Sequence, residues 1–388
     1  MYDIVAQEER YQLKTYKKFP FAIAKGEGSW VITTEGERYL DLYGGHAVVS
    51  TGHCHPHVVK AIQDQAATLL FYSNLVYHET RAKAAEMLAK AAPEGMDHVF
   101  FINSGAEAND NALKLARQLT KKSMILSFDG GFHGRTIATL SATGVPKYRD
   151  VIVPRMMEHL FAPFGDLEAV AALFAKHPIA GVMLEPIQSM AGVRMAEPSF
   201  YQGLRALCDQ HDALLIYDEV QTGFGRTGGQ MFFAPRAGVV PDLITLAKSI
   251  GSGVPMGALL VRDRYAAQIH YGDLGTTFGG GPLASAALKA TLEVIEQENL
   301  LDHVARESAY LTEQLIGMDG VEKVLGLGFL MGVRFTKPAA QIQKQLLENK
   351  IITGLSEDPH VMRLLPPLVL KREEIDLFLS VLIRCLSV

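Results

Sequence analysis

Polar residues that can do chemistry stand at the ends of four apolar segments of this sequence. They are Asn103, Ser104 and Gly105 after 98–102, Glu185 and Gln188 in and after 180–187, Asp218 after 213–217, and Lys248 after 242–247. Each has an ordinary structural explanation when it is taken alone, such as a solvated strand end or a helix cap. In an open α/β sheet, however, ligands bind beside the carboxyl ends of the strands. Because one sheet edge would gather all four groups, the pattern indicates a binding site there.

These groups fit pyridoxal phosphate. A lysine amine that an apolar strand keeps out of water can bind an aldehyde covalently, which favours Lys248 as the attachment point. A buried carboxylate such as Asp218 keeps a pyridine nitrogen protonated, which explains why an apolar strand runs into an anion. Amides at the start of a helix bind phosphate, and Ser104, Gly105 and Ala106 open a helical pattern.

The flat ring of this cofactor also needs apolar cover on its two faces. Phe132 in GGFHGRT is the candidate for one face, and Val220, which follows Asp218 by two residues, is the candidate for the other. A single phenylalanine is usually part of a core, so this assignment depends on the other site residues.

The composition of the chain excludes several classes of function. Of its 388 residues, 48% are hydrophobic and 20% are charged, and the net charge is -5. These values predict a large core in two or three lobes and no nucleic-acid binding. No apolar run approaches the roughly 18 residues that span a bilayer. The N-terminal segment has no apolar region of a secretory signal, and the three cysteines are scattered singly, so we expect a cytoplasmic protein.

The stretch 52–57 (GHCHPH) resembles a metal site, because three histidines and a cysteine lie close together. No second ligand cluster lies elsewhere at ligand spacing, and a proline and a helical pattern over 56–73 follow at once. We therefore predict a loop that leads into a helix, and no metal.

The segments between the candidate residues alternate as in an α/β protein. Apolar runs predict strands at 98–102, 124–128, 180–187, 213–217, 242–248 and 257–263, with helices at 105–119, 166–177 and 197–212. Runs that are apolar throughout favour a mostly parallel sheet covered on both faces. The two ends of the chain predict a second, smaller α+β lobe. We expect residues 1–50 and 286–388 to form this lobe and residues 51–285 to form the large cofactor-binding lobe.

Seven motifs across nearly the whole chain resemble those of the class III aminotransferases. They are FFINSGAEANDNALKLAR, GGFHGRT, LEPIQ, IYDEVQTGFGRTG, TLAKSIGSGVPMGALL, GTTFGGGPLASAAL and VMRLLPPLVL. Within that class the sequence is most similar to the acetylornithine/succinylornithine branch, with ornithine and 4-aminobutyrate aminotransferases as close relatives. The resemblance implies the aspartate-aminotransferase fold, which is fold type I of the pyridoxal-phosphate enzymes. It also implies a homodimer with both active sites at the subunit interface.

The resemblance implies a role for each matching residue. Lys248 would bind the cofactor and Asp218 would pair with its ring nitrogen. The cofactor-binding positions would be Ser104, Gly105, Ala106, Phe132, Glu185, Val220, Gln221 and, from the second subunit, Thr277. Arg135 would hold the distal carboxylate of the substrate, and Arg363 the α-carboxylate of 2-oxoglutarate. Guanidinium groups suit this task because they bind carboxylates bidentately.

Three positions depart from the family's pattern and concern the substrate rather than the cofactor. Met190 in EPIQSMAG replaces the glutamate that neutralises the second arginine in enzymes that act on ω-amines. His46 stands where free-ornithine enzymes carry a tyrosine, which counts against free ornithine. Gly281 replaces the usual asparagine of GGNP. Met190 and His46 join the two arginines as predicted substrate-binding residues.

The resemblance implies an aminotransferase that moves the terminal amine of an N-acyl-ornithine, acetyl or succinyl, to 2-oxoglutarate. The products would be an N-acyl-glutamate semialdehyde and glutamate, with Lys248 as both covalent anchor and general base. One alternative is another class III enzyme, acting on ornithine, 4-aminobutyrate or another ω-amine. An α-amino-acid or dialkylglycine-type enzyme is a second alternative, against which Arg135 argues. A non-catalytic regulatory dimer is disfavoured because Lys248 and Asp218 are both intact.

Overall fold

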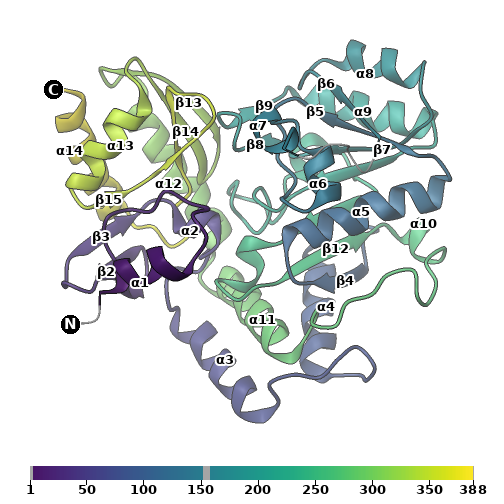
Figure 1. The fold of residues 1–388 in the computed structure, drawn as a ribbon, viewed down its shortest axis with the longest axis horizontal. Coiled ribbons are helices and arrows are strands. Elements are labelled where there is room, and N and C mark those ends of the chain that lie inside the picture. Colours follow the sequence, from purple (N-terminus) through teal and green to yellow (C-terminus); the bar gives the residue numbers. More distant parts are fainter. Residues whose placement is uncertain (1–2, 152–157, 388) are drawn as a thin grey trace.

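The structure, a computed structural model, describes residues 3–151 and 158–387, which form two lobes (Figure 1). The larger lobe is built on a seven-stranded sheet with the order β4-β12-β11-β10-β7-β5-β6. Its strands are β4 (His98–Ile102), β5 (Met124–Phe128), β6 (His159–Ala162), β7 (Ile179–Leu184), β10 (Leu214–Asp218), β11 (Leu243–Leu246) and β12 (Gly257–Val261). Neighbours from β11 to β6 run parallel, whereas β12 is antiparallel to both β11 and β4. The predicted mostly parallel sheet is confirmed, with one reversed strand that the apolar runs do not reveal.

Helices cover both faces of this sheet. One face carries α5 (Gly105–Thr120), and the other carries α8 (Leu167–Phe174) and α9 (Pro198–Gln210). The residues of strand β10 alternate between these two faces of the sheet. Leu214 and Ile216 belong to the buried cluster that contains α5, whereas Leu215 and Tyr217 belong to the cluster that contains α9. The strand is therefore buried on both sides, as its uninterrupted apolar sequence predicts.

A group of helices lies below the two lobes in the view of Figure 1. It consists of α3 (Pro56–Thr68) and α4 (Glu79–Ala91), which both pack on α11 (Pro282–Gln297). The helix expected over 56–73 ends earlier, at Thr68. The apolar residues that follow it find no core within the chain, since Leu70 is 62% exposed and Leu75 is 89% exposed.

The smaller lobe combines both ends of the chain. Its first sheet has the order β1-β2-β3-β15, in which β15 (Ile351–Ile352) pairs in parallel with β3 (Arg38–Asp41). Its other elements are β1 (Ile23–Glu27), β2 (Trp30–Thr33), the antiparallel sheet β13 (Val321–Leu327), β14 (Leu330–Phe335), β17 (Val361–Leu364) and β16 (Gly354–Leu355), and helices α12 (Leu300–Leu315), α13 (Ala339–Glu348) and α14 (Arg372–Leu386). The boundaries proposed from the sequence stay predictions, and residues 1–2, 152–157 and 388 of those ranges lie outside the described residues.

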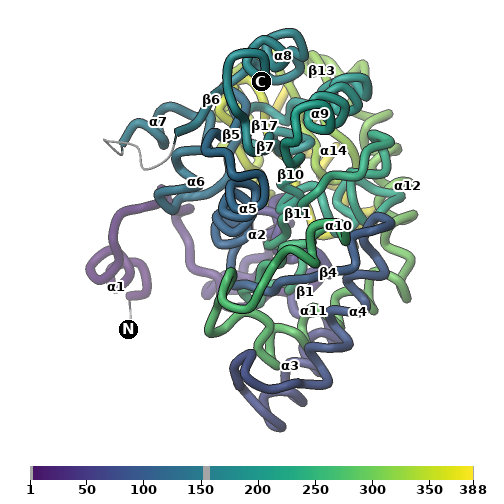
Figure 2. Tube along the Cα trace, turned by 90° about the vertical axis from the view of Figure 1, so that its right-hand side faces the viewer, coloured from purple at the N-terminus to yellow at the C-terminus, as the bar shows by residue number. Residues whose placement is uncertain are grey.

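The remaining elements are short. They are α1 (Ile4–Tyr11), α2 (Gly44–Ala47), α6 (Ile137–Ala142), α7 (Pro146–Arg149), β8 (Ile187–Gln188), β9 (Arg194–Met195), η1 (Ala234–Ala237), η2 (Lys248–Gly251) and α10 (Asp263–Ala266). Figure 2 shows α1 standing off one side of the molecule, and none of its residues is buried. Among the described residues, no helix combines the length and the apolar character that a membrane span needs.

Candidate active site

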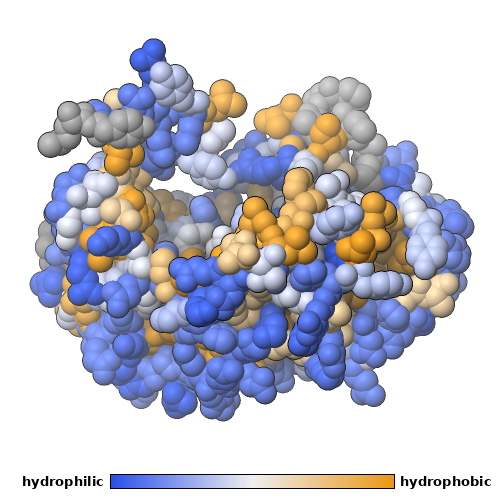
Figure 3. Space-filling model, turned by 90° about the horizontal axis from the view of Figure 1, so that it is seen from below, coloured by the Kyte–Doolittle hydropathy of each residue, from blue (hydrophilic) through white to orange (hydrophobic). Residues whose placement is uncertain are grey.

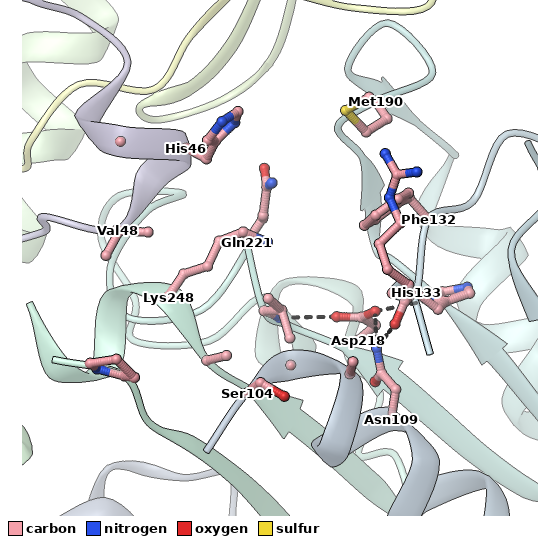
Figure 4. A pocket seen from close by; sticks show the side chains of 18 of the residues that line it. His46, Val48, Ser104, Asn109, Phe132, His133, Met190, Asp218, Gln221 and Lys248 are labelled. Atoms are coloured by element: carbon pink, nitrogen blue, oxygen red, sulfur yellow. Dashed lines mark hydrogen bonds and ion pairs between the residues drawn. The ribbon is translucent and has the colours of Figure 1, made fainter. Parts of the chain in front are cut away.

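A cavity of about 710 Å³ opens at the carboxyl ends of the central strands. It is lined by every predicted site residue except Thr277, namely His46, Ser104, Gly105, Ala106, Phe132, Arg135, Glu185, Met190, Asp218, Val220, Gln221, Lys248 and Arg363. Figure 4 shows His46 and Lys248 on one side of this cavity and Met190 and Phe132 on the other, with Asp218 and Asn109 at its base. The large sheet and the smaller lobe together therefore bring into one cavity residues that lie more than three hundred positions apart in the sequence, such as His46 and Arg363.

Asp218 and Glu219 point in opposite directions, because side chains alternate along a strand. Asp218 lies on the side of α5, where its Oδ2 accepts a hydrogen bond from Asn109 Nδ2 at 2.8 Å. Glu219 lies on the other side and accepts bonds from the backbone amides of residues 233 and 234 at 2.7 and 3.0 Å. Asp218 thus belongs to the cavity, whereas Glu219 holds a turn behind it.

Two residues that the sequence reasoning did not single out hold Asp218 in place. His133 Nδ1 lies 2.8 Å from Asp218 Oδ2, and Asn109 bonds to the same oxygen. Asn109 is fixed in turn, since its Nδ2 also donates to the carbonyl of His133 at 2.7 Å and its Oδ1 accepts from Thr245. The spacing could have identified both residues: Asn109 follows Gly105 by one helical turn, and His133 is the residue after Phe132.

Lys248 begins the short helix η2, directly after the buried strand β11, and its φ of 46° lies in the left-handed region. A lysine in that conformation stores backbone strain of the kind that gathers at functional sites. Burial lowers the pKa of Lys248, while the charges of Asp218 and Glu185 oppose the shift. A lowered pKa increases the share of neutral amine, which is the form that attacks a carbonyl carbon.

Glu185 supports the loop that carries Phe132. Its Oε1 accepts a hydrogen bond from the backbone amide of Phe132 at 2.8 Å. Burial and then the charge of Asp218 raise the pKa of Glu185 to about 7. The buried carboxyl group of Glu185 therefore affects the cavity not only through its charge. It also fixes the position of the Phe132 ring.

Helix α5 presents its N-terminus to the cavity. Ser104 is the N-cap, as predicted, and its Oγ accepts from the amide of Glu107 at 3.2 Å. The first amides of a helix have no intrahelical acceptor, so those of Gly105 and Ala106 are suited to an anion. A Cβ atom on Gly105 would lie 3.1 Å from Val220 Cγ2, a tight contact that would push the Val220 side chain away from its present position.

Arg363 is buried at 3% exposure, and three uncharged oxygens receive its hydrogen bonds. Its Nε donates to the carbonyl of Leu355 at 2.8 Å, Nη1 to Ser189 Oγ at 3.1 Å and Nη2 to Tyr43 Oη at 2.6 Å. Within the described ranges, no carboxylate forms an ion pair with Arg363. Ser189 and Tyr43 are site residues that the sequence reasoning did not identify, and Tyr43 is 320 positions away from its partner.

Arg135 stands at the open side of the cavity and stacks on aromatic rings. Its Cζ lies 3.9 Å from the ring centre of Tyr148 and 5.5 Å from that of Phe132. Tyr148 is held by a hydrogen bond from its hydroxyl to Glu357 at 3.2 Å, and the backbone amide of Glu357 donates to the carbonyl of Met190 at 2.8 Å. The stacking leaves the nitrogens of the guanidinium group available to a carboxylate.

Thr277 lies outside the cavity on the exposed surface of the chain. The histidines of GHCHPH also lie elsewhere, and each pairs with a carboxylate at 2.8 Å: His53 with Asp41, His55 with Glu298 and His57 with Glu293.

The cavity fits pyridoxal phosphate group by group. The start of α5 suits the phosphate, the buried amine of Lys248 suits the aldehyde carbon, and Asp218 suits the ring nitrogen. The Oε1 of Gln221 is buried and has no hydrogen-bond partner in the described structure, which makes it a free acceptor for a hydroxyl group such as that of the ring. The fold and the site together define a pyridoxal-phosphate enzyme of fold type I.

Comparisons with known sequences identify the family. The model of the class-III aminotransferases matches residues 11–386, so the chain belongs to the class III aminotransferases. The acetylornithine aminotransferase of Methanosarcina acetivorans is 42% identical over 382 residues, which cover 98% of this chain and 95% of that protein. The acetylornithine aminotransferase of Methanocaldococcus jannaschii is 40% identical over 385 residues, which cover 97% of this chain and 96% of that protein.

Solved structures share the same fold. The ornithine aminotransferase of Toxoplasma gondii matches with a TM-score of 0.92 at 29% identity, over 99% of this chain and 94% of that one. A further structure of that enzyme has partial occupancy of PLP, pyridoxal phosphate, at its active site. The acetylornithine aminotransferase of Elizabethkingia anophelis matches with a TM-score of 0.86 at 28% identity, over 99% of this chain and 98% of that one. The chain is a PLP-dependent aminotransferase, with amino-acid and keto-acid substrates.

Proposed function

We propose that the enzyme transfers the terminal amine of an N-acyl-ornithine to 2-oxoglutarate. The observation that supports this most directly is the pair of arginines beside Lys248. Neither Arg135 nor Arg363 is neutralised by a carboxylate in the part of the chain that the structure describes, so both can receive a carboxylate of the substrate. The acetylornithine aminotransferases that match nearly the whole chain support the same choice of amino donor.

The residues of the cavity divide the work. Bound PLP would supply an aldehyde, whose carbon carries the amino group from one substrate to the other, and an electron-withdrawing ring. Lys248 would hold the cofactor through its amine, and the same amine group is placed to act as the general base that moves a proton of the substrate. Asp218, oriented by His133 and Asn109, keeps a negative charge beside the ring nitrogen.

The remaining residues bind and orient. Arg363 would hold the α-carboxylate of glutamate and 2-oxoglutarate, and Arg135 the other carboxylate of the bound substrate. Ser104, Gly105 and Ala106 would bind the phosphate. Further cofactor contacts would come from Phe132, Val220, Gln221 and Glu185.

We further propose that two copies of the chain form a homodimer that completes the phosphate site. The chain carries an apolar surface after α3, with Leu75 at 89% and Phe278 at 64% exposure, and Figure 3 shows apolar side chains gathered on this face. Apolar side chains gathered on an exposed surface are typical of a protein–protein interface. Thr277 adjoins Phe278 and would reach the phosphate of the second subunit.

Three free cysteines favour the cytoplasm as the location of the protein.

A panel of amino donors tests the proposal. Purified enzyme is assayed with 2-oxoglutarate and, in turn, N-acetylornithine, N-succinylornithine, free ornithine, 4-aminobutyrate and an α-amino acid. We expect kcat/KM to be highest for one of the two N-acyl-ornithines. A higher value for free ornithine, for 4-aminobutyrate or for the α-amino acid would replace the proposed donor with that compound and leave the aminotransferase class unchanged.

A further inference from the structure

His46 is held in the cavity by an unusual turn of the chain. Residues 44–47 all have positive φ, with 54° at Gly44, 68° at His46 and 64° at Ala47, and they form one turn of left-handed helix. The amide of Ala47 donates to the carbonyl of Tyr43 at 3.0 Å, and Asp41 Oδ1 accepts from the amides of residues 43 and 44 at 2.9 Å each. Left-handed helix is costly for residues other than glycine, so the position of His46 is maintained against strain.

Hydrogen bonds fix which nitrogen of His46 carries the proton. Arginine can only donate, so Tyr43 Oη accepts from Arg363 Nη2 at 2.6 Å. The hydroxyl proton of Tyr43 then has one acceptor within the described residues, His46 Nδ1 at 2.9 Å. Partial burial and the charges of Arg363 and Lys248 lower the pKa of His46, which favours the neutral ring. A neutral ring that accepts at Nδ1 carries its proton on Nε2.

The surroundings of this Nε2–H group determine what it can bind. The charges of Arg363 and Lys248 both disfavour a further positive charge beside His46, and the charge of Asp41 opposes them less strongly. The α-ammonium group of a free diamino acid has only donors and one positive charge, so the Nε2–H donor of His46 cannot pair with it. Acylation removes that charge and adds a carbonyl oxygen, which is an acceptor for an N–H donor.

We propose that His46 Nε2–H donates a hydrogen bond to the carbonyl of the N-acyl group and thereby selects N-acylated over free diamino acids. This inference rests on the proposed function, because it names the group by which the same cavity recognises its amino donor. Tyr43 is a positioning residue that sets the tautomer. The turn at 44–47, anchored by Asp41, is what places the ring.

Three substitutions of His46 test the inference. His46→Leu removes the donor and should lower kcat/KM for N-acetylornithine about tenfold, as expected for one lost hydrogen bond. It should lower kcat/KM for 5-aminopentanoate by a clearly smaller factor, because that ω-amine has no acyl group. His46→Gln places an amide nitrogen where Nε2 lies and should restore the preference. His46→Asn reaches only as far as Nδ1 and should not.

The comparison of His46→Gln with His46→Asn distinguishes recognition of the acyl group from a structural role of residue 46. Asparagine tolerates positive φ better than glutamine, so a merely structural role at position 46 predicts the opposite order, with Asn above Gln. A binding measurement avoids turnover altogether. N-acetyl-L-norvaline, which has the acyl group and the carboxylate but no terminal amine, should bind the wild type and His46→Gln by calorimetry about tenfold more tightly than His46→Leu.

The outcomes separate the two hypotheses. If the wild type shows no preference for N-acetylornithine over ornithine and 5-aminopentanoate, the proposed function fails and this inference fails with it. If the preference exists but is the same in His46→Leu, or if Asn restores it better than Gln, the proposed function stands and the role of His46 is overturned.

Discussion

Met190→Glu tests how Arg363 is kept available to substrate. Ser189 Oγ receives a hydrogen bond from Arg363 at 3.1 Å, and the next residue, Met190, lines the same cavity. A glutamate at position 190 would bring a carboxylate close to the guanidinium group. We expect it to compete with the α-carboxylate of glutamate and 2-oxoglutarate, while N-acetylornithine, whose carboxylate would bind Arg135, is spared or helped.

The size of the effect follows from the charges. Two unit charges about 4 Å apart attract by about 4 kcal/mol at an effective dielectric constant of about 20. Part of this is lost because the added carboxylate must be taken out of water. A net coupling of about 1.4 to 2.8 kcal/mol remains, which weakens glutamate by a factor of about 10 to 100.

Single-turnover half-reactions measure this effect separately for each donor. Enzyme with bound cofactor is mixed with glutamate or with N-acetylornithine, and the cofactor absorbance is followed. Met190→Gln is the matched control, because it has the size and polarity of glutamate without its charge. Equal weakening of both donors by Met190→Glu, or the same weakening of glutamate by Met190→Gln, would show that Met190 only packs in the cavity.

Four further predictions concern the cofactor, the dimer and stability. Lys248→Ala should still bind cofactor but catalyse no turnover, and peptide mapping after borohydride reduction of the wild type should find the label on Lys248 and on no other lysine. Asp218→Asn should lower turnover roughly 10³-fold while reduction still labels Lys248, so near-normal turnover would contradict the role of the charge. Lys248→Ala and Thr277→Ala homodimers, once subunits exchange, should regain activity in a minority of sites; failure despite exchange would place the phosphate site within one chain. Burial raises the pKa of Glu219 to about 7, so the folded state binds more protons than the unfolded state between its ordinary value of 4.5 and about 7. The free energy of unfolding should therefore fall as pH rises through this window, and denaturant titrations should show a smaller fall in Glu219→Gln.

The strand ends could be read from the sequence because each depends on local pattern. Asp218 and Lys248 follow runs that are apolar throughout, and such runs end at the same sheet edge when the strands are parallel. The alternation along β10 also decides which of the two adjacent carboxylates faces the cavity. The reversed direction of β12 could not be read in this way, because a buried antiparallel strand and a buried parallel strand have the same composition.

The residues that contact Arg363 and Asp218 could not be predicted from the sequence, for a different reason. Tyr43 meets Arg363 only because β15 brings the C-terminal part of the chain beside β3, and nothing in the local sequence of either residue encodes that pairing. His133 and Asn109 meet Asp218 only once α5 lies across the sheet. Sequence patterns of this kind identify groups that do chemistry better than the residues that orient them.

The uncharged acceptors around Arg363 would allow one cavity to serve two carboxylates in turn. Arg363 donates to a carbonyl and two hydroxyl groups, which satisfy its hydrogen bonds without cancelling its charge. An incoming carboxylate therefore needs to displace only uncharged acceptors, and it gains the full attraction of a buried cation. If a carboxylate of the protein paired with Arg363, that ion pair would have to be broken before glutamate or 2-oxoglutarate could bind. The free energy of breaking it would weaken the binding of both. Ser189 and Tyr43 hold Arg363 ready for either substrate, and this is why we expect a single added charge at position 190 to separate the two half-reactions.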